Sequence, residues 1–332
     1  MILFTIIFNW ILLFYVECQE DLFQPDDNQL VDYINQYPTA GWKAESNSLL
    51  RNIDGVQNPI GAQSIDQSIG KESLPTVIHT DVNITVPKHF DARSHWKNCS
   101  DIQQIHDESQ CISNWAIASA KAISDRICIK SHGKIQVNLS VHNLISCCKT
   151  CGHGCHNGHA SFAWHYWQSD GLVTEACQPY IFPHCEHYKY GKKYRTCGVH
   201  IFTTPVCEFQ CIKGYTIPYD EDKFYGEIVY NVNNRVEDIQ KEILLNGPVT
   251  ATLDMFTDFP IYKSGIYKHI TGNLIGMHTV RIIGWGEENG IAYWLCANSW
   301  NEDWGENGYF RIIRGENECF IESFVVAGLP KF

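Results

Sequence analysis

The residues best placed to do chemistry lie at the expected start of a helix, in the run Cys111-Ile112-Ser113-Asn114-Trp115-Ala116. The spacing of the small and apolar residues that follow predicts a helix over 114–130 with one buried face, formed by Ala116, Ala120, Ile123 and Ile127. A side chain at position 114 would stand at the helix N-terminus, where outward-pointing N–H groups favour negative charge. A thiolate there would be an activated nucleophile, but this chain has Asn114.

The elements that must position this run change in character along the chain. Helical patterns at 139–144, 160–169 and 236–246 follow the first helix, and Gly247-Pro248 stops the last of them. After that the apolar period becomes two, which predicts strands over 250–254, 279–285, 291–297 and 308–314. Glu288-Asn289-Gly290 is a good hairpin turn between two of them. The pattern therefore predicts an α+β fold with helices first and antiparallel strands second.

The composition limits the function classes. With 332 residues, 44% hydrophobic and 13% aromatic, the chain can form one large domain or two modest ones. The net charge of -12 and the lack of a basic run argue against nucleic acid and anionic membranes as partners. Fifteen cysteines favour an oxidising compartment.

The first 85 residues have a different texture from the rest. The apolar run Ile2–Val16 predicts a secretory signal over 1–18, because it is short for a membrane span. Residues 19–85 are polar and cannot hold a core alone, so we expect a pro-segment, or an extension that lies on the rest of the chain, with a boundary near Val86-Pro87. A secreted or lysosomal product is expected, with sequons at Asn83, Asn98 and Asn138 as candidate glycosylation sites.

Three separated runs resemble the papain-like cysteine proteases: 107–116, Gly276-Met277-His278 and Ala297-Asn298-Ser299-Trp300. Further matches to the cathepsin B branch are the segments 122–129, 147–148, 185–187, 293–295 and 325–328. The resemblance covers nearly all of the chain after Val86, and 28–47 with its Trp42 resembles the short propeptide of that branch. It implies a peptidase domain over 86–332.

The resemblance also implies an architecture. We expect a helical left domain, a right domain built on an antiparallel β-barrel, and an active cleft between them. An occluding loop within the region 177–211, at about 185–197, would close one end of the cleft. By the family's pattern the disulfides are Cys99–Cys128, Cys111–Cys155, Cys147–Cys207, Cys148–Cys151, Cys177–Cys211 and Cys185–Cys197. Cys296 and Cys319 remain as buried free thiols.

The run 147–155 has a competing interpretation. Its cysteines, with His153, His156 and His159, have a spacing that could bind zinc. Disulfides are favoured in a secreted chain whose cysteines match the family's pairs, and we expect no metal and no cofactor.

The family's reaction needs a thiolate, a histidine that shares its proton, and a group that orients the imidazole. The resemblance assigns the second and third roles to His278 and Asn298, with Trp300 shielding their contact from water. The nucleophile position is Asn114, whose amide neither ionises near neutral pH nor attacks a carbonyl usefully. Ser113 is no substitute, because one helical residue turns the side chain by about 100°. Asparagine caps helix starts well, and we expect Asn114 to do so.

A second departure concerns the oxyanion hole, to which the family contributes a glutamine side chain. The aligned position is Glu108, whose ionised form would repel the oxygen of a tetrahedral intermediate. Removing one donor typically costs about 10²–10³ in rate, and a repelling charge should cost at least as much.

The walls of the expected cleft differ from the family's pattern as well. Asn157-Gly158 replaces a glycine pair and Met277 replaces a glycine, which narrows the cleft. Phe324 replaces the acidic floor of the second side-chain pocket, so an apolar preference is expected there. In the occluding loop His187 is present but its neighbour is Tyr188, which puts removal of C-terminal dipeptides in doubt.

These observations lead to three hypotheses. The first is a secreted, catalytically inactive homologue, a monomer that binds peptides or protein segments, or cystatin-type inhibitors, in its cleft. The second is a working peptidase that uses another nucleophile or a water molecule activated by His278. The third is a structural or storage module without a ligand site.

Overall fold

The computed structural model describes residues 27–46, 74–80, 84–186, 193–198 and 200–332. The expected signal over 1–18, Asn83, His187 and Tyr188 lie outside these residues. No helix in the described ranges is long and apolar enough to cross a membrane.

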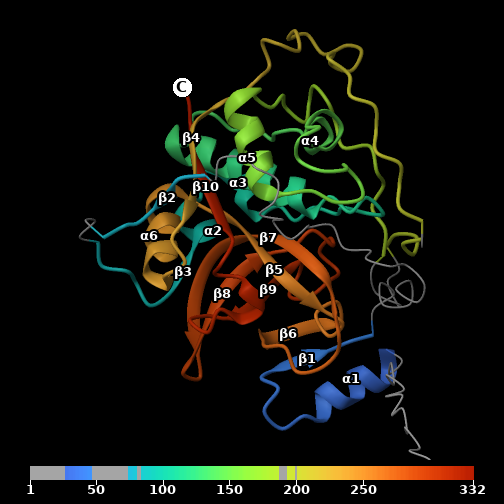
Figure 1. The fold of residues 1–332 in the computed structure, drawn as a ribbon, viewed down its shortest axis with the longest axis vertical. Coiled ribbons are helices and arrows are strands. Elements are labelled where there is room, and N and C mark those ends of the chain that lie inside the picture. Colours follow the sequence, from blue (N-terminus) through green and yellow to red (C-terminus); the bar gives the residue numbers. More distant parts are fainter. Residues whose placement is uncertain (1–26, 47–73, 81–83, 187–192, 199) are drawn as a thin grey trace, which may run out of the picture.

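The helices α3, α4 and α5 gather on one side of the molecule, and β5 to β9 form the other side (Figure 1). On the helical side, α3 (Asn114–Lys130) is central, because every residue from Asn114 to Ile129 is buried. α4 (Val141–Cys147) and α5 (Ala160–Ser169) pack against it. α6 (Val236–Asn246) contacts α3 and the strands β4 and β7. The bounds predicted for α3, α5 and α6 agree with the structure. Gly247 ends α6 with a φ of 106°, as the Gly-Pro stop predicts.

The strands form one mixed sheet in the order β1-β6-β9-β8-β7-β5-β10-β4-β2, with β3 paired to β7. Their bounds are β1 Trp42–Ala44, β2 Thr76–Val77, β3 Phe90–Asp91, β4 Gly226–Val232, β5 Val249–Phe256, β6 Tyr262–Tyr267, β7 Leu274–Glu288, β8 Ile291–Ala297, β9 Tyr309–Ile313 and β10 Val325–Pro330. Most pairs are antiparallel, as expected, but β6–β9 and β2–β4 are parallel. The four predicted strands correspond to β5, β7, β8 and β9, whereas β4, β6 and β10 were not predicted. Short helical segments complete the described chain: α2 Ala92–His95, η2 Ser100–Gln103 and η3 Glu318–Phe320.

The two sides meet where α3 packs on β7. The N-terminal part of α3 reaches β7 through Asn114, whose amide oxygen accepts from Thr279 N. Further along α3, Asp125 pairs with Arg281 of β7 at 2.5 Å. Arg126 donates to Glu242 of α6 at 2.8 Å and to three backbone carbonyls, and both side chains are fully buried. This helix therefore fixes the geometry of everything placed at its start.

The described residues before Val86, here called the N-terminal segment, lie against the sheet rather than forming a core of their own. β1 pairs with β6 and so extends the sheet by one strand, and α1 (Asp27–Gln36) packs next to β1 (Figure 1). Trp42 donates to Lys268 O and packs on Tyr262 and Tyr267. At the other end of the sheet β2 pairs with β4, and His79 contacts Glu242 at 2.6 Å.

Six disulfides tie the helical side and its loops together, and they join the same six pairs that the resemblance implies. All four cysteines of the run 147–155 are thus bonded to other cysteines, so none of them is available to ligate zinc. Cys296 and Cys319 are free and buried.

Candidate active site

The sheet side of the site consists of His278, Asn298 and Trp300. His278 lies in β7, and Asn298 directly follows β8, which pairs with β7. His278 Nε2 lies 2.7 Å from Asn298 Oδ1, and that oxygen also accepts from Ser299 N at 2.8 Å. Because the amide oxygen only accepts, the imidazole carries its proton on Nε2 and presents a bare Nδ1. The Trp300 ring covers this pair, with its centroid 4.7 Å from that of the imidazole.

The imidazole is held in its neutral form. Burial lowers the pKa of His278 to about 4, although the hydrogen bond to Asn298 opposes this shift. Nδ1 is buried and has no hydrogen-bond partner among the described residues. The sheet side therefore holds a positioned base with no acidic proton beside it.

The helix side of the site is built around Asn114. Its Oδ1 accepts from Thr279 N at 3.2 Å and its Nδ2 donates to Glu108 Oε2 at 3.2 Å. The amide therefore links the helix to β7 at the residue after His278. The capping expectation for this residue is wrong. Asn114 is the first helical residue, and Ser113 occupies the N-cap position without a side-chain cap bond.

Glu108 supplies the missing cap. Its Oε2 accepts from Asn114 N at 2.7 Å, and its Oε1 accepts from Trp300 Nε1 at 2.6 Å. Burial raises the pKa of this carboxyl to about 8, against the pull of these N–H donors. At acidic pH Glu108 is therefore largely neutral, and the repulsion expected from its charge applies only as it ionises. In either form its oxygens face donors within the protein.

Ser113 is turned away from the imidazole. Its hydroxyl donates to Cys111 O at 3.2 Å and lies 2.8 Å from Tyr180 Oη. The loop closed by the Cys185–Cys197 disulfide begins near the start of the helix, because Asp107 Oδ2 accepts from Cys185 N at 2.9 Å. Asp107 also lies 3.3 Å from His184, so this carboxylate anchors the base of the Cys185–Cys197 loop next to the helix entry.

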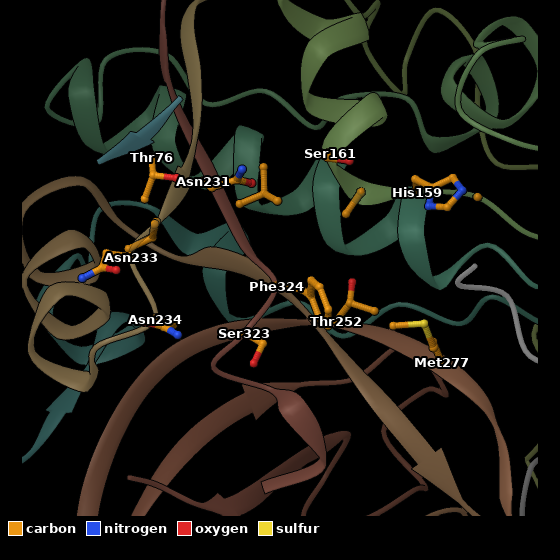
Figure 2. A pocket seen from close by; sticks show the side chains of 14 residues that line it. Thr76, His159, Ser161, Asn231, Asn233, Asn234, Thr252, Met277, Ser323 and Phe324 are labelled. Atoms are coloured by element: carbon orange, nitrogen blue, oxygen red, sulfur yellow. The ribbon is translucent and has the colours of Figure 1, made fainter. Parts of the chain in front are cut away.

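A pocket of about 390 Å³ lies between residues of the helical side and residues of the sheet, and Figure 2 shows its lining. Its lining includes Met277 but not His278, Asn298 or Asn114. Gly158, Met277 and Phe324 are among the lining residues, and in the figure Thr252 lies between Phe324 and Met277. Gly158 is required there, because a Cβ would lie 2.3 Å from the Trp115 ring. Asn157 is not among the lining residues, and its carbonyl accepts from His153 N at 2.9 Å.

Some lining residues were not predicted. Thr76 of the N-terminal segment lines the pocket together with Asn231 and Asn233 from β4 and its end (Figure 2). Thr76 pairs with Asn231 of β4, far away in the sequence. No local sequence pattern predicts a contact between residues so distant.

The two described sequons differ in accessibility. Asn98 is exposed, whereas Asn138 is half-buried and its Oδ1 accepts from Lys121 Nζ at 3.2 Å. The described residues contain no cluster of three or more metal-ligating side chains.

Comparisons with known proteins agree with this geometry. A family model described as papain family cysteine protease matches residues 86–329. A cathepsin B-like cysteine proteinase of Schistosoma japonicum is 48% identical over 315 residues, covering 93% of this chain and 92% of its own length. Cathepsin B-like cysteine proteinase 6 of Caenorhabditis elegans is 42% identical and covers 95% of this chain and 86% of its own. Procathepsin B S9 of Trypanosoma congolense superposes with a TM-score of 0.79 at 38% identity, covering 91% of this chain and 97% of that one.

Proposed function

This chain belongs to the papain family of cysteine proteases, in its cathepsin B-like branch, and we propose that it binds peptides without cleaving them by thiol chemistry. Its disulfides and relatives indicate the secretory pathway. We extend this to a monomeric protein that is secreted or lysosomal, with residues 1–18 as signal and 19–85 as pro-segment.

The observation that carries the proposal is the hydrogen bonding of Asn114. Both polar atoms of its amide are engaged, one with Thr279 N and one with Glu108 Oε2. An amide in this position has no proton that a neutral imidazole can remove, and it forms no covalent intermediate with a carbonyl carbon. His278 and Asn298 thus keep their mutual geometry with no nucleophile to activate.

The neighbouring carboxyl supports the same conclusion. An oxyanion needs donors aimed at the developing charge, but both Glu108 oxygens accept hydrogen bonds from inside the protein. Ionised, this side chain opposes the negative charge of a tetrahedral intermediate. Neutral, it has one O–H in place of the two amide N–H donors of the family's glutamine, and its oxygens stay engaged with Asn114 and Trp300.

Binding remains available to this fold. The 390 Å³ pocket is lined by Phe324, Met277 and Thr252, which favours an extended peptide with an apolar side chain. Thr76 also lines it and β2 pairs with β4, so a ligand must share or replace that segment. A chain without a nucleophile cannot process itself, so removal of the pro-segment would require another protease. Cystatin-type inhibitors are further candidates for the same cleft.

The test is direct turnover of a broad peptide library by the purified chain, read by mass spectrometry, with calorimetric titration of peptides and a cystatin. We expect no cleavage above the blank and saturable binding. Cleavage that disappears in His278→Ala would refute the proposal. Absence of both cleavage and binding would favour a structural or storage module.

A second candidate function is hydrolysis by a water molecule that His278 activates. The specific observation in its favour is the bare, unpartnered Nδ1 of His278. Thiol-directed epoxides cannot report on this route, because they react with a cysteine that is not there. The library assay distinguishes it, since slow cleavage abolished by His278→Ala would be its signature.

A further inference from the structure

A surface cavity of about 390 Å³ lies where the turn after α2 meets the end of α3. Its lining combines residues 94–99 with three residues at and just after the end of α3: Ile129, His132 and Gly133. The Cys99–Cys128 disulfide ties the turn to the helix, and Cys99 N donates to Trp96 O at 2.9 Å. The surface cavity shares no lining residue with the pocket between helices and sheet, so it is separate from the candidate site.

One of the lining residues is Asn98, the asparagine of the sequon Asn98-Cys99-Ser100. Asn98 and Ser100 are both exposed, and the Asn98 amide makes no hydrogen bond within the described chain. Gly133 has a φ of 79°, and a Cβ on it would lie 3.2 Å from Asn98 Cβ, so the glycine leaves this side chain its space. The sequon excludes only proline at its middle position, where Cys99 stands. Asn98 is thus an accessible acceptor for a glycan.

The other described sequon, at Asn138, is built into the fold. The hydroxyl of Ser140, its third residue, is fully buried and caps α4 by accepting from Asn143 N at 2.9 Å. The same hydroxyl donates to Gln178 O. Asn138 itself is half-buried, and its Oδ1 accepts from the buried Lys121 at 3.2 Å. A sugar on this side chain would have to fit among these contacts, which makes the position unsuited to modification.

The lining of the surface cavity suits a sugar ring. The Trp96 indole is half-buried, and the centroid of the His95 ring lies 4.7 Å from it. The negative face of an aromatic ring attracts the C–H groups on the apolar face of a pyranose. Ser94, Lys97 and His132 are exposed around it and can form hydrogen bonds with sugar hydroxyls. An aromatic surface beside a few polar groups can hold a carbohydrate.

We propose that Asn98 carries an N-linked glycan whose first sugar lies in this surface cavity, and that Asn138 stays unmodified. The attachment forms a bond between Asn98 Nδ2 and the anomeric carbon of the sugar. It breaks the bond from that carbon to the phosphate of a lipid-linked oligosaccharide diphosphate, so the lipid diphosphate leaves and the amide loses one proton. Cys128 follows Cys99 by 29 residues, so the sequon is synthesised before its cysteine can pair. The inference rests on the proposed secretory route and is independent of whether the cleft binds or cleaves peptides.

The first test detects the glycan on the full chain secreted from cultured eukaryotic cells. Peptide N-glycosidase in heavy-oxygen water converts a glycosylated asparagine into a labelled aspartate, which peptide mass spectrometry locates. We expect the label at Asn98 in most of the secreted protein and no label at Asn138. Absence of the label at Asn98, or its presence at Asn138, would overturn the proposal.

Matched variants separate the two sequons by electrophoretic mobility. Asn98→Gln and Ser100→Ala should each lose the mass of one glycan, because either change destroys the first sequon. Ser100→Ala keeps the asparagine, so it serves if Asn98→Gln does not fold. Asn138→Gln should keep the glycan mass of the wild type. Unchanged glycan mass in Asn98→Gln or Ser100→Ala, or a loss in Asn138→Gln, would contradict the assignment.

The second test locates the first sugar. A crystal structure of the glycoprotein should show its C–H face against the Trp96 indole. In solution, peptide N-glycosidase should release the glycan several-fold faster from native Trp96→Ala than from the wild type or from Lys134→Ala, an exposed control outside the lining. His132→Asn is the second variant, because asparagine tolerates the φ of 54° found there. A first sugar that points into solvent, or equal release rates in all four proteins, would overturn its placement in the surface cavity.

Discussion

Two buried glutamates pack against opposite ends of α3, and their pKa values are shifted in opposite directions. Glu242 faces the C-terminal half of the helix and pairs with the guanidinium of Arg126. Burial alone would raise the pKa of Glu242, but Arg126 and His79 lower it to about 2. Glu108 faces the N-terminus of the helix and has only neutral N–H donors, so burial raises its pKa to about 8. Glu242, which holds two helices together, is thus charged and paired with a cation. Glu108, at the candidate site, is costly to ionise.

This contrast separates what holds the fold together from what the site does. The Arg126–Glu242 pair links α3 to α6 and to the carbonyls around Gly247 and Gly328. The Glu108–Asn114 pair links the helix start to its own entry loop, to β7 and to Trp300 after β8. We therefore expect changes in the first region to unfold the protein and changes in the second to alter its chemistry and pH response.

The largest effect on stability is expected from Arg126→Met. Removing the guanidinium leaves Glu242 charged and buried without its cation, which costs about 3–5 kcal/mol in the free energy of unfolding. Denaturant unfolding measures this loss. Lys268→Met is the matched control, because its pair with Glu316 is exposed and should cost less than about 1 kcal/mol. Equal losses in the two variants would remove the distinction drawn between framework and surface charges.

The raised pKa of Glu108 should be visible in the pH dependence of the free energy of unfolding. Because the pKa of folded Glu108 is raised to about 8, its contribution is fully present below about pH 4.5 and is lost as pH rises to about 8. The stability of the wild type relative to Glu108→Gln should therefore fall over this window, by up to about 1.4 kcal/mol per pH unit. Unfolding titrations of both proteins from pH 4.5 to 8 measure it. A difference that is flat with pH would mean that Glu108 is ionised throughout.

Glu242 should show the opposite sign. Its lowered pKa means that its contribution is present above about pH 4.5 and is lost as pH falls towards 2. The combined contribution of the two carboxyls to the free energy of unfolding is therefore greatest near pH 4.5. Unfolding titrations over one pH series, from about 2 to 8, measure both losses.

A smaller effect is expected from Asn114→Ala. The change leaves Thr279 N without its acceptor and removes one donor from Glu108, which should cost about 1–2 kcal/mol. The exposed Asn234→Ala provides the control and should change stability little. If Asn114→Ala were neutral as well, the amide would not be the link between helix and sheet described above.

The sequence predicted the parts of this fold that depend on local pattern. The bounds of α3, α5, α6 and β8 follow from apolar periodicity and from the Gly247-Pro248 stop. The hairpin turn is also confirmed, because Asn289 and Gly290 have φ of 53° and 81° between β7 and β8. β6 and β10 were missed because they lack clear alternation, and the parallel pairing of β6 with β9 depends on a distant partner.

The site was less predictable than the fold. The placement of His278 beside Asn298 follows from the resemblance, and so do the disulfide pairs. The direction of the Asn114 side chain does not, because it depends on a carboxyl that approaches from the entry loop and on an amide of β7. Similarly, no sequence pattern indicates that Glu108 would be buried against Trp300, where burial raises its pKa to about 8 and limits the expected repulsion to the pH range in which it ionises.

The most direct test of the central claim compares Asn114→Cys with Asn114→Cys plus Glu108→Gln, measuring kcat/KM on a small peptide substrate. A thiol at this helix N-terminus, at the residue that contacts the backbone next to His278, restores a nucleophile, but only the double variant also restores the oxyanion donor. We predict weak activity in the single variant and activity about 10²–10³-fold higher in the double variant. Equal, robust activity in both would show that Glu108 does not disable the site. Full activity of the unmodified chain would contradict the account as a whole.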